Sequence, residues 1–249
     1  MSKKWLKVAL MVTAIATGTS IQVDAETVLY VPQDDRPVSL QYTVDTAKAA
    51  GMTVLTPPQY LISGKTYSGE AEQIWNWVEQ NAGRADVMVL STDTLIYGGL
   101  VDSRKHNLPL STLENRLKRI EALKANHKNT RIYGFGTVMR SPRASGGGTE
   151  PTYYADYGPT IFQIAALQDK LDSGALTEEE TAKLFSLQAS VPIEYLQDWF
   201  ARRQKNMKIN KGLIDETRNG VFTYFALGHD DTSQLSKSAL DGRSLNKYS

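Results

Sequence analysis

Thr27–Val31 (TVLYV), followed at once by Pro32, is the stretch of sequence that decides the fold. Its side chains are β-branched or apolar, and a short run of this kind without polar alternation is typical of a strand buried on both faces of a parallel sheet. Proline then ends the strand, because its nitrogen has no hydrogen to donate to a neighbouring strand. The run therefore predicts a buried first strand from which the chain turns directly into a loop.

Strand and helix patterns alternate along the next hundred residues. The second strand, for example, follows a helical stretch that stops at Gly51. Strand–helix–strand repeats imply parallel neighbours joined by right-handed crossovers. A capping box is predicted at Ser111–Glu114, where it would begin the third helix. The predicted strands are 27–31, 52–55, 86–91, 131–138 and 221–227, and the first three predicted helices are 40–50, 70–81 and 113–125.

Three helical stretches, at 160–171, 177–189 and 192–206, separate the fourth strand from the fifth. A polar loop at 144–150, with three consecutive glycines, precedes them. The predicted class is α/β, with a parallel β/α sheet and a helical segment between strands 4 and 5. The sheet is expected to be either open and doubly wound or part of a β/α barrel.

The amino terminus has the pattern of a secretory signal peptide. Lys3, Lys4 and Lys7 precede an apolar stretch at 8–21, and small residues at Val23 and Ala25 suit a signal peptidase. We expect residues 1–25 to be removed, leaving one α/β domain at 26–249; the alternative is an uncleaved anchor. The mature protein would be secreted, periplasmic or in the cell envelope, with no stable membrane span.

The composition narrows the class of partner. The chain has 28 lysines and arginines against 27 aspartates and glutamates, and no cysteine. No basic stripe interleaved with aromatic residues occurs, so a nucleic-acid partner is not expected. Nucleotide-binding glycine fingerprints, the Gly-x-Ser-x-Gly elbow and the His-Glu-x-x-His zinc motif are absent too, and no cofactor or metal is predicted.

Acidic and arginine side chains follow the predicted strands where they end. The carboxyl ends of parallel strands meet at one edge of a sheet, so we expect these side chains to share a cleft. Crowded carboxylates raise the pKa of at least one of them, which suits an acid in glycosidic-bond hydrolysis. The candidate substrate-binding residues are Asp34, Asp35, Arg36, Asp93, Tyr97, Arg104, Arg140 and His229, and the candidate catalytic residues are Asp230 and Asp231.

Some of these residues also have a purely structural interpretation. Asp34 or Asp35 would cap the helix that Pro37 begins, since aspartate is a favoured cap and proline suits the first helical position. Asp35 with Arg36 would form a surface ion pair that contributes little to stability.

The same choice applies further along the chain. Asp102 with Arg104 would form a second surface ion pair. Gly98-Gly99 would either let the backbone approach a ligand or form a tight turn. His106 and His127 are expected to be solvated.

Four separated strings carry a resemblance to a known family. They are VPQDDRPV at 31–38, STD at 91–93 running into YGGLVDSR at 97–104, Tyr154 with Tyr157-Gly158, and GHDD at 228–231. Together they resemble domain-of-unknown-function family 4127, an uncharacterised group of secreted bacterial proteins. The resemblance spans nearly all of the mature chain. Its members generally continue well beyond the Asp-Asp pair, so this chain is expected to be a C-terminally shortened form.

Three hypotheses for function follow. The first is a carbohydrate-active hydrolase in which Asp230 and Asp231 are acid and polarising base. This pair also looks like the acidic pair of β/α-barrel hexosaminidases, by analogy of fold alone. The second is a non-catalytic module that binds envelope polysaccharide or peptidoglycan. The third, ranked last, is a metal-dependent hydrolase that uses carboxylates and His229.

Overall fold

The computed structural model describes residues 25–144, 147–230 and 233–249 of the 249-residue chain. Residues 1–24, which hold almost all of the predicted signal peptide, lie outside this description.

Five parallel strands form the centre of the described structure, in the order β2-β1-β3-β4-β5. β2 and β5 occupy the two edges, so the sheet is open and not closed into a barrel. The order reverses between β1 and β3, as in doubly wound folds. The predicted α/β class is confirmed, and the open alternative is the one observed. The strands are β1 (Thr27–Val31), β2 (Thr53–Leu55), β3 (Val87–Ser91), β4 (Arg131–Val138) and β5 (Tyr224–His229).

One face of the sheet is covered by α3 (Ala71–Asn81), α6 (Leu110–Asn126) and the carboxyl half of α9 (Ile193–Arg218). Trp75 of α3 is fully buried there and donates a 2.8 Å hydrogen bond to the carbonyl of Leu95. The crossovers thus bury their apolar stripes on the strands that they connect. Other fully buried members of this cluster are Leu29, Val31, Ile74, Val78, Ala82, Met88, Leu90, Leu95, Ile96, Leu113, Ile120 and Ile132.

The opposite face of the sheet carries a thinner layer. α2 (Gln41–Ala49) packs against β2 but contains no buried residue. Along β4, the residues at 132, 134, 136 and 138 are buried, whereas those at 133, 135 and 137 are only partly covered. Tyr224 of the edge strand β5 is 64% exposed.

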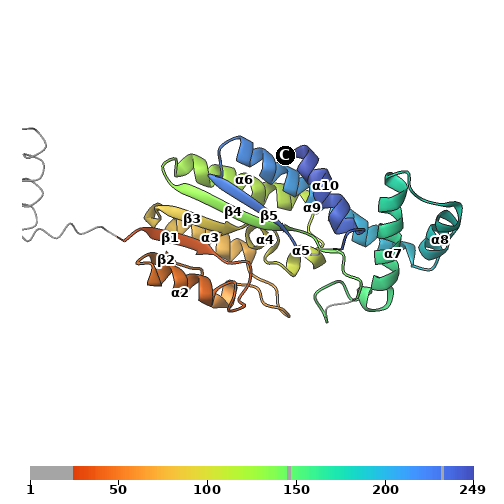
Figure 1. Ribbon diagram of the computed structural model, residues 1–249. Helices are drawn as coiled ribbons and strands as arrows, with labels where there is room; N and C mark the ends of the chain where they lie inside the picture. The colour runs from red at the N-terminus through yellow and green to blue at the C-terminus, as the bar shows by residue number, and fades with distance from the viewer. Residues whose placement is uncertain (1–24, 145–146, 231–232) are drawn as a thin grey trace, which may run out of the picture.

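A second hydrophobic cluster lies beyond the carboxyl ends of the strands, where α7 (Tyr154–Asp172) and α8 (Glu178–Ala189) stand apart from the sheet (Figure 1). Both helices pack on the amino half of α9, around the fully buried ring of Trp199. α9 therefore belongs to both clusters, since Ile209 and Leu213 of its carboxyl half lie in the sheet cluster.

A buried ion pair joins α9 to α10 (Lys237–Tyr248) and to the end of β4. The Arg203 guanidinium donates to Asp241 Oδ2 at 2.7 and 3.0 Å. It also donates to the carbonyls of Met139 and Arg140 at 2.8 and 2.9 Å. Arg203 is 1% exposed, and these four bonds compensate for the loss of water around its charge.

Several element boundaries differ from those predicted. The predicted capping box at Ser111–Glu114 is wrong, because α6 begins at Leu110, three residues before the predicted start, and Pro109 is its cap. α8 begins at Glu178, with Thr177 as its cap and Glu180 completing a capping box. α9 continues to Arg218, beyond the predicted end at residue 206. In the described ranges, no helix is both long and apolar enough to cross a membrane. The patterns did not predict α4 (Thr92–Tyr97), α5 (Asp102–Lys105), α10 or the short turns of 3-10 helix at Gln59–Leu61 and Ala82–Arg84.

The same substitution at a buried and at an exposed valine tests how much burial contributes to stability. Val31 is fully buried at the end of β1, whereas Val38, seven residues later, is 64% exposed. Val31→Ala should lower the free energy of unfolding by about 2 kcal/mol, through two lost methyl groups and the cavity left behind. Val38→Ala should change it by less than about 0.5 kcal/mol. Urea unfolding measures both, and equal losses would contradict the assignment of β1 to the core.

Candidate functional site

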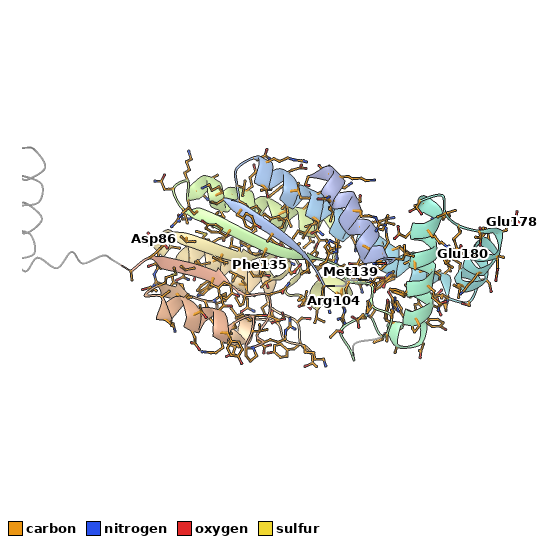
Figure 2. All side chains as sticks on the ribbon, in the orientation of Figure 1. Asp86, Arg104, Phe135, Met139, Glu178 and Glu180 are labelled. Atoms are coloured by element: carbon orange, nitrogen blue, oxygen red, sulfur yellow. The ribbon has the colours of Figure 1, made fainter. Side chains whose placement is uncertain are left out.

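A cavity of about 270 Å³ lies at the carboxyl ends of the strands. Figure 2 labels Arg104 and Met139 at this end of the sheet and Asp86 at the opposite end. The lining side chains come from the loops that follow β1, β2, β3 and β4 and from the end of β5. They are Asp34, Arg36, Lys65, Leu100, Val101, Arg104, Arg140, Thr149 and Asp230.

The topology explains this position. The strand order reverses between β1 and β3, so the loops that leave these two strands diverge to opposite sides and open a crevice between them. Asp34 and Arg36 follow β1, and Arg104 follows β3. Five predicted site residues, Asp34, Arg36, Arg104, Arg140 and Asp230, are thereby brought to one cavity.

Asp34 and Arg36 form one tight turn after Pro32. Asp34 Oδ1 accepts from the Arg36 backbone N–H at 3.2 Å, and Oδ2 accepts from Arg36 Nε at 2.7 Å. This hydrogen bond raises the pKa of the Arg36 guanidinium. The predicted helix cap at Asp34 or Asp35 is wrong, since α2 begins at Gln41 and Leu40 is its cap. The predicted Asp35–Arg36 pair is likewise replaced by Asp34–Arg36.

Arg104, on α5, is part of the cavity wall and is only 4% exposed. Its Nη2 donates to Asp230, and its Nη1 lies 3.9 Å from Glu150 Oε1. Burial lowers the pKa of this guanidinium, as does the nearby charge of Arg140, while Asp230, Glu150 and Asp93 act in the opposite direction. Arg104 is thus a buried cation paired across the sheet, and the expected surface pair with Asp102 does not form.

Arg140 is fixed by two residues of the loop that follows it. Its Nε donates to Glu150 Oε1 at 2.7 Å, and its Nη2 donates to Thr149 Oγ1 at 2.7 Å. Thr149 in turn donates to Glu150 Oε2 at 2.9 Å, and the Glu150 side chain has no exposed surface. One buried carboxylate therefore holds Arg140 in place and lies close to Arg104.

Asp93 lies beneath the cavity and does not line it. It is 2% exposed, and its Oδ2 accepts from Gln33 Nε2 at 2.7 Å and from Thr137 Oγ1 at 2.8 Å. Burial raises the pKa of this carboxyl to about 6, although the two hydrogen bonds act to lower it.

Three other candidates point elsewhere. Tyr97 is buried and stacks on His106, with ring centroids 5.0 Å apart. Asp35 accepts from the hydroxyl of Tyr67, outside the cavity wall. His229 packs against α10, where a Cβ on Gly242 would lie 1.9 Å from the imidazole. Asp231 lies outside the described residues.

His106 and the glycine pair serve the packing of loops. The prediction that His106 is solvated is wrong: it is 8% exposed, lies 2.8 Å from Asn206 Oδ1, and burial lowers its pKa to about 4. Gly98 has a φ of 106°, and a Cβ on Gly99 would lie 1.8 Å from Ser63 Oγ. The glycine pair therefore makes room for the loop before α3 and leaves no gap there for a ligand.

Sequence reasoning missed Lys65, Thr149 and Glu150. All three lie in irregular segments that carry no periodic pattern, and their place in the site depends on contacts with distant residues. Glu150 ends the glycine-containing loop. Its position ten residues after Arg140, close enough in the chain for an ion pair, was the one signal that could have indicated its role. The described chain contains no cluster of three or more histidine or acidic residues arranged to hold a metal ion.

Comparison with known protein families identifies one match, over residues 28–249, to the family described as "Protein of unknown function (DUF4127)". The chain belongs to the DUF4127 family. No curated protein and no solved structure matches it.

Three of the four strings that resemble DUF4127 contribute side chains to the cavity. The first supplies Asp34 and Arg36, the second supplies Arg104 and the fourth supplies Asp230. The remaining string contains Tyr154, which is buried in the second hydrophobic cluster and donates to the carbonyl of Pro142 at 2.7 Å.

The buried carboxyl of Asp93 makes stability depend on pH. Its pKa is raised in the folded chain, so between about pH 4 and pH 6 the folded protein holds a proton that the unfolded chain has released. The free energy of unfolding should therefore lose a few kcal/mol across this window as the pH rises, relative to Asp93→Asn. Urea unfolding at four pH values measures the difference. For the exposed control Asp45→Asn, the free energy of unfolding should vary with pH as it does in the unsubstituted protein. The same pH dependence in Asp93→Asn would contradict the assignment of the raised pKa to Asp93.

Proposed function

We propose that this DUF4127 protein is a carbohydrate-active hydrolase of the cell envelope or the medium, acting at the cavity formed by the strand ends. One observation carries the proposal: carboxylates and arginines from widely separated loops line a single cavity at the switch point of a doubly wound sheet. Its volume, about 270 Å³, suits one or two sugar rings.

Asp230 is the carboxylate on which the chemistry depends. Its side chain is 35% exposed, and it receives a hydrogen bond from the buried Arg104. A carboxylate held in this way can stabilise positive charge at a sugar carbon or activate water. In the proposed reaction Asp230 and Asp231 together supply the acid and the polarising base, while Asp34 and the arginines hold the sugar.

Binding of envelope polysaccharide or peptidoglycan without turnover is the second candidate. A specific observation favours it: both carboxylates that line the cavity, Asp34 and Asp230, are bonded to arginines, so their oxygens are already engaged by protein partners.

Turnover distinguishes these candidates. The mature protein, residues 26–249, is incubated with chromogenic glycosides and isolated cell-wall polysaccharides, and release of product is followed. Asp230→Asn should lower kcat by at least about 100-fold, because the charge that stabilises the transition state is lost.

Asp172→Asn is the matched control, since Asp172 is exposed at the far end of α7, and it should leave turnover unchanged. Saccharide binding without turnover in the unsubstituted protein would favour the binding module. Absence of both binding and turnover would contradict the proposal as a whole.

A further inference from the structure

We propose that the ligand of this cavity carries an oxyanion, a carboxylate or a phosphate, which is bound by Arg104 together with Arg36, Arg140 and Lys65. The inference rests on the proposed function and deepens it, because it names an acidic saccharide as the substrate class.

The charges on the cavity wall are unequal. Four cationic side chains line it, and two carboxylates, Asp34 and Asp230, face them. The third nearby carboxylate, Glu150, is fully buried behind Arg140 and is not part of the wall. A ligand in the cavity therefore meets an excess of positive charge, which attracts anions.

Arg104 has donors to spare. A guanidinium has five N–H donors, and Arg104 makes a single hydrogen bond within the described chain, from Nη2 to Asp230. It is nevertheless 4% exposed, so little water surrounds the remaining donors. A buried guanidinium with unused donors in a cavity wall is an arrangement suited to a planar or tetrahedral oxyanion.

Lys65 contributes a cation without a partner. It is exposed at the mouth of the cavity, and among the described residues no carboxylate lies within ion-pair distance of its ammonium. Arg36 and Arg140, by contrast, are held in position by Asp34 and Glu150. Two oriented guanidiniums and one free ammonium thus surround Arg104, and a bound oxyanion would reduce the repulsion between Arg104 and Arg140.

A carboxylate and a phosphate share this chemistry, and paired probes distinguish them. Isothermal calorimetry on the mature protein, residues 26–249, compares methyl glucuronide with methyl glucoside, glucose 6-phosphate with glucose, and inorganic phosphate alone. At least one charged sugar should bind about tenfold or more tightly than its uncharged partner, and its affinity should fall as salt is raised.

Variants locate the anion. Lys65→Gln should weaken binding of the charged probe about threefold to tenfold and leave its uncharged partner unaffected. Arg104→Gln should abolish the preference for charge. Because Arg104 is buried, thermal unfolding is measured beside it, and Lys65→Gln with Arg36→Gln carries the test if Arg104→Gln does not fold. Lys48→Gln, on the exposed surface of α2, is the control and should bind as the unsubstituted protein does.

The outcomes separate this inference from the proposed function. Equal affinity for charged and uncharged sugars would overturn the inference while the saccharide site stands. Binding of inorganic phosphate without any sugar would support the anion site and contradict the saccharide function. Failure of every charged probe to bind overturns the inference.

Discussion

All five strands run in the same direction, and the position of the site depends on that constraint. A parallel sheet places every strand's carboxyl end at one edge, and each connection must cross a face to return. The edge therefore collects irregular loops, while the crossing helices α3, α6 and α9 form the core on one side. Asp34, Arg104, Arg140 and Asp230 are far apart in the chain but lie at one cavity because each follows a strand of the same sheet.

Electrostatics then limits what this edge can contain. The buried Arg104 and the partly buried Arg140 lie near one another, and burial alone would make such a pair unfavourable. The fully buried Glu150 bonds to the Arg140 guanidinium and lies 3.9 Å from that of Arg104, and Asp230, which follows β5, bonds to Arg104. Asp93, deeper in the sheet, is balanced differently, because neutral donors from Gln33 and Thr137 hold it. This edge of the sheet thus holds ion-paired charges in the cavity wall and, outside the wall, a carboxyl that is hydrogen-bonded to neutral donors.

The strands and the helices between them could be predicted because they carry strong periodic patterns: the predicted bounds of β1 and β4 are those observed. Strand ends followed by charged residues also pointed to Asp34, Arg104, Arg140 and Asp230. The remainder depends on contacts between distant segments. No local pattern shows that Lys65 and Glu150 reach the cavity, that His229 packs on α10, or that Tyr97 stacks on His106. α10 was missed because its sequence is polar and has no apolar periodicity. Its buried positions are Ser238, Asp241, Gly242 and Leu245, of which only the last is a large apolar residue.

The sharing of α9 between two hydrophobic clusters has a mechanical consequence. The helix is a continuous rod, with Trp199 anchored among α7 and α8 and Ile209 anchored under the sheet. Between these anchors Arg203 holds the carbonyls of Met139 and Arg140. A tilt of the outer helices would therefore act through α9 as a lever on the strand end that carries Arg140. A displacement of α7 and α8 would in this way change the width of the cavity.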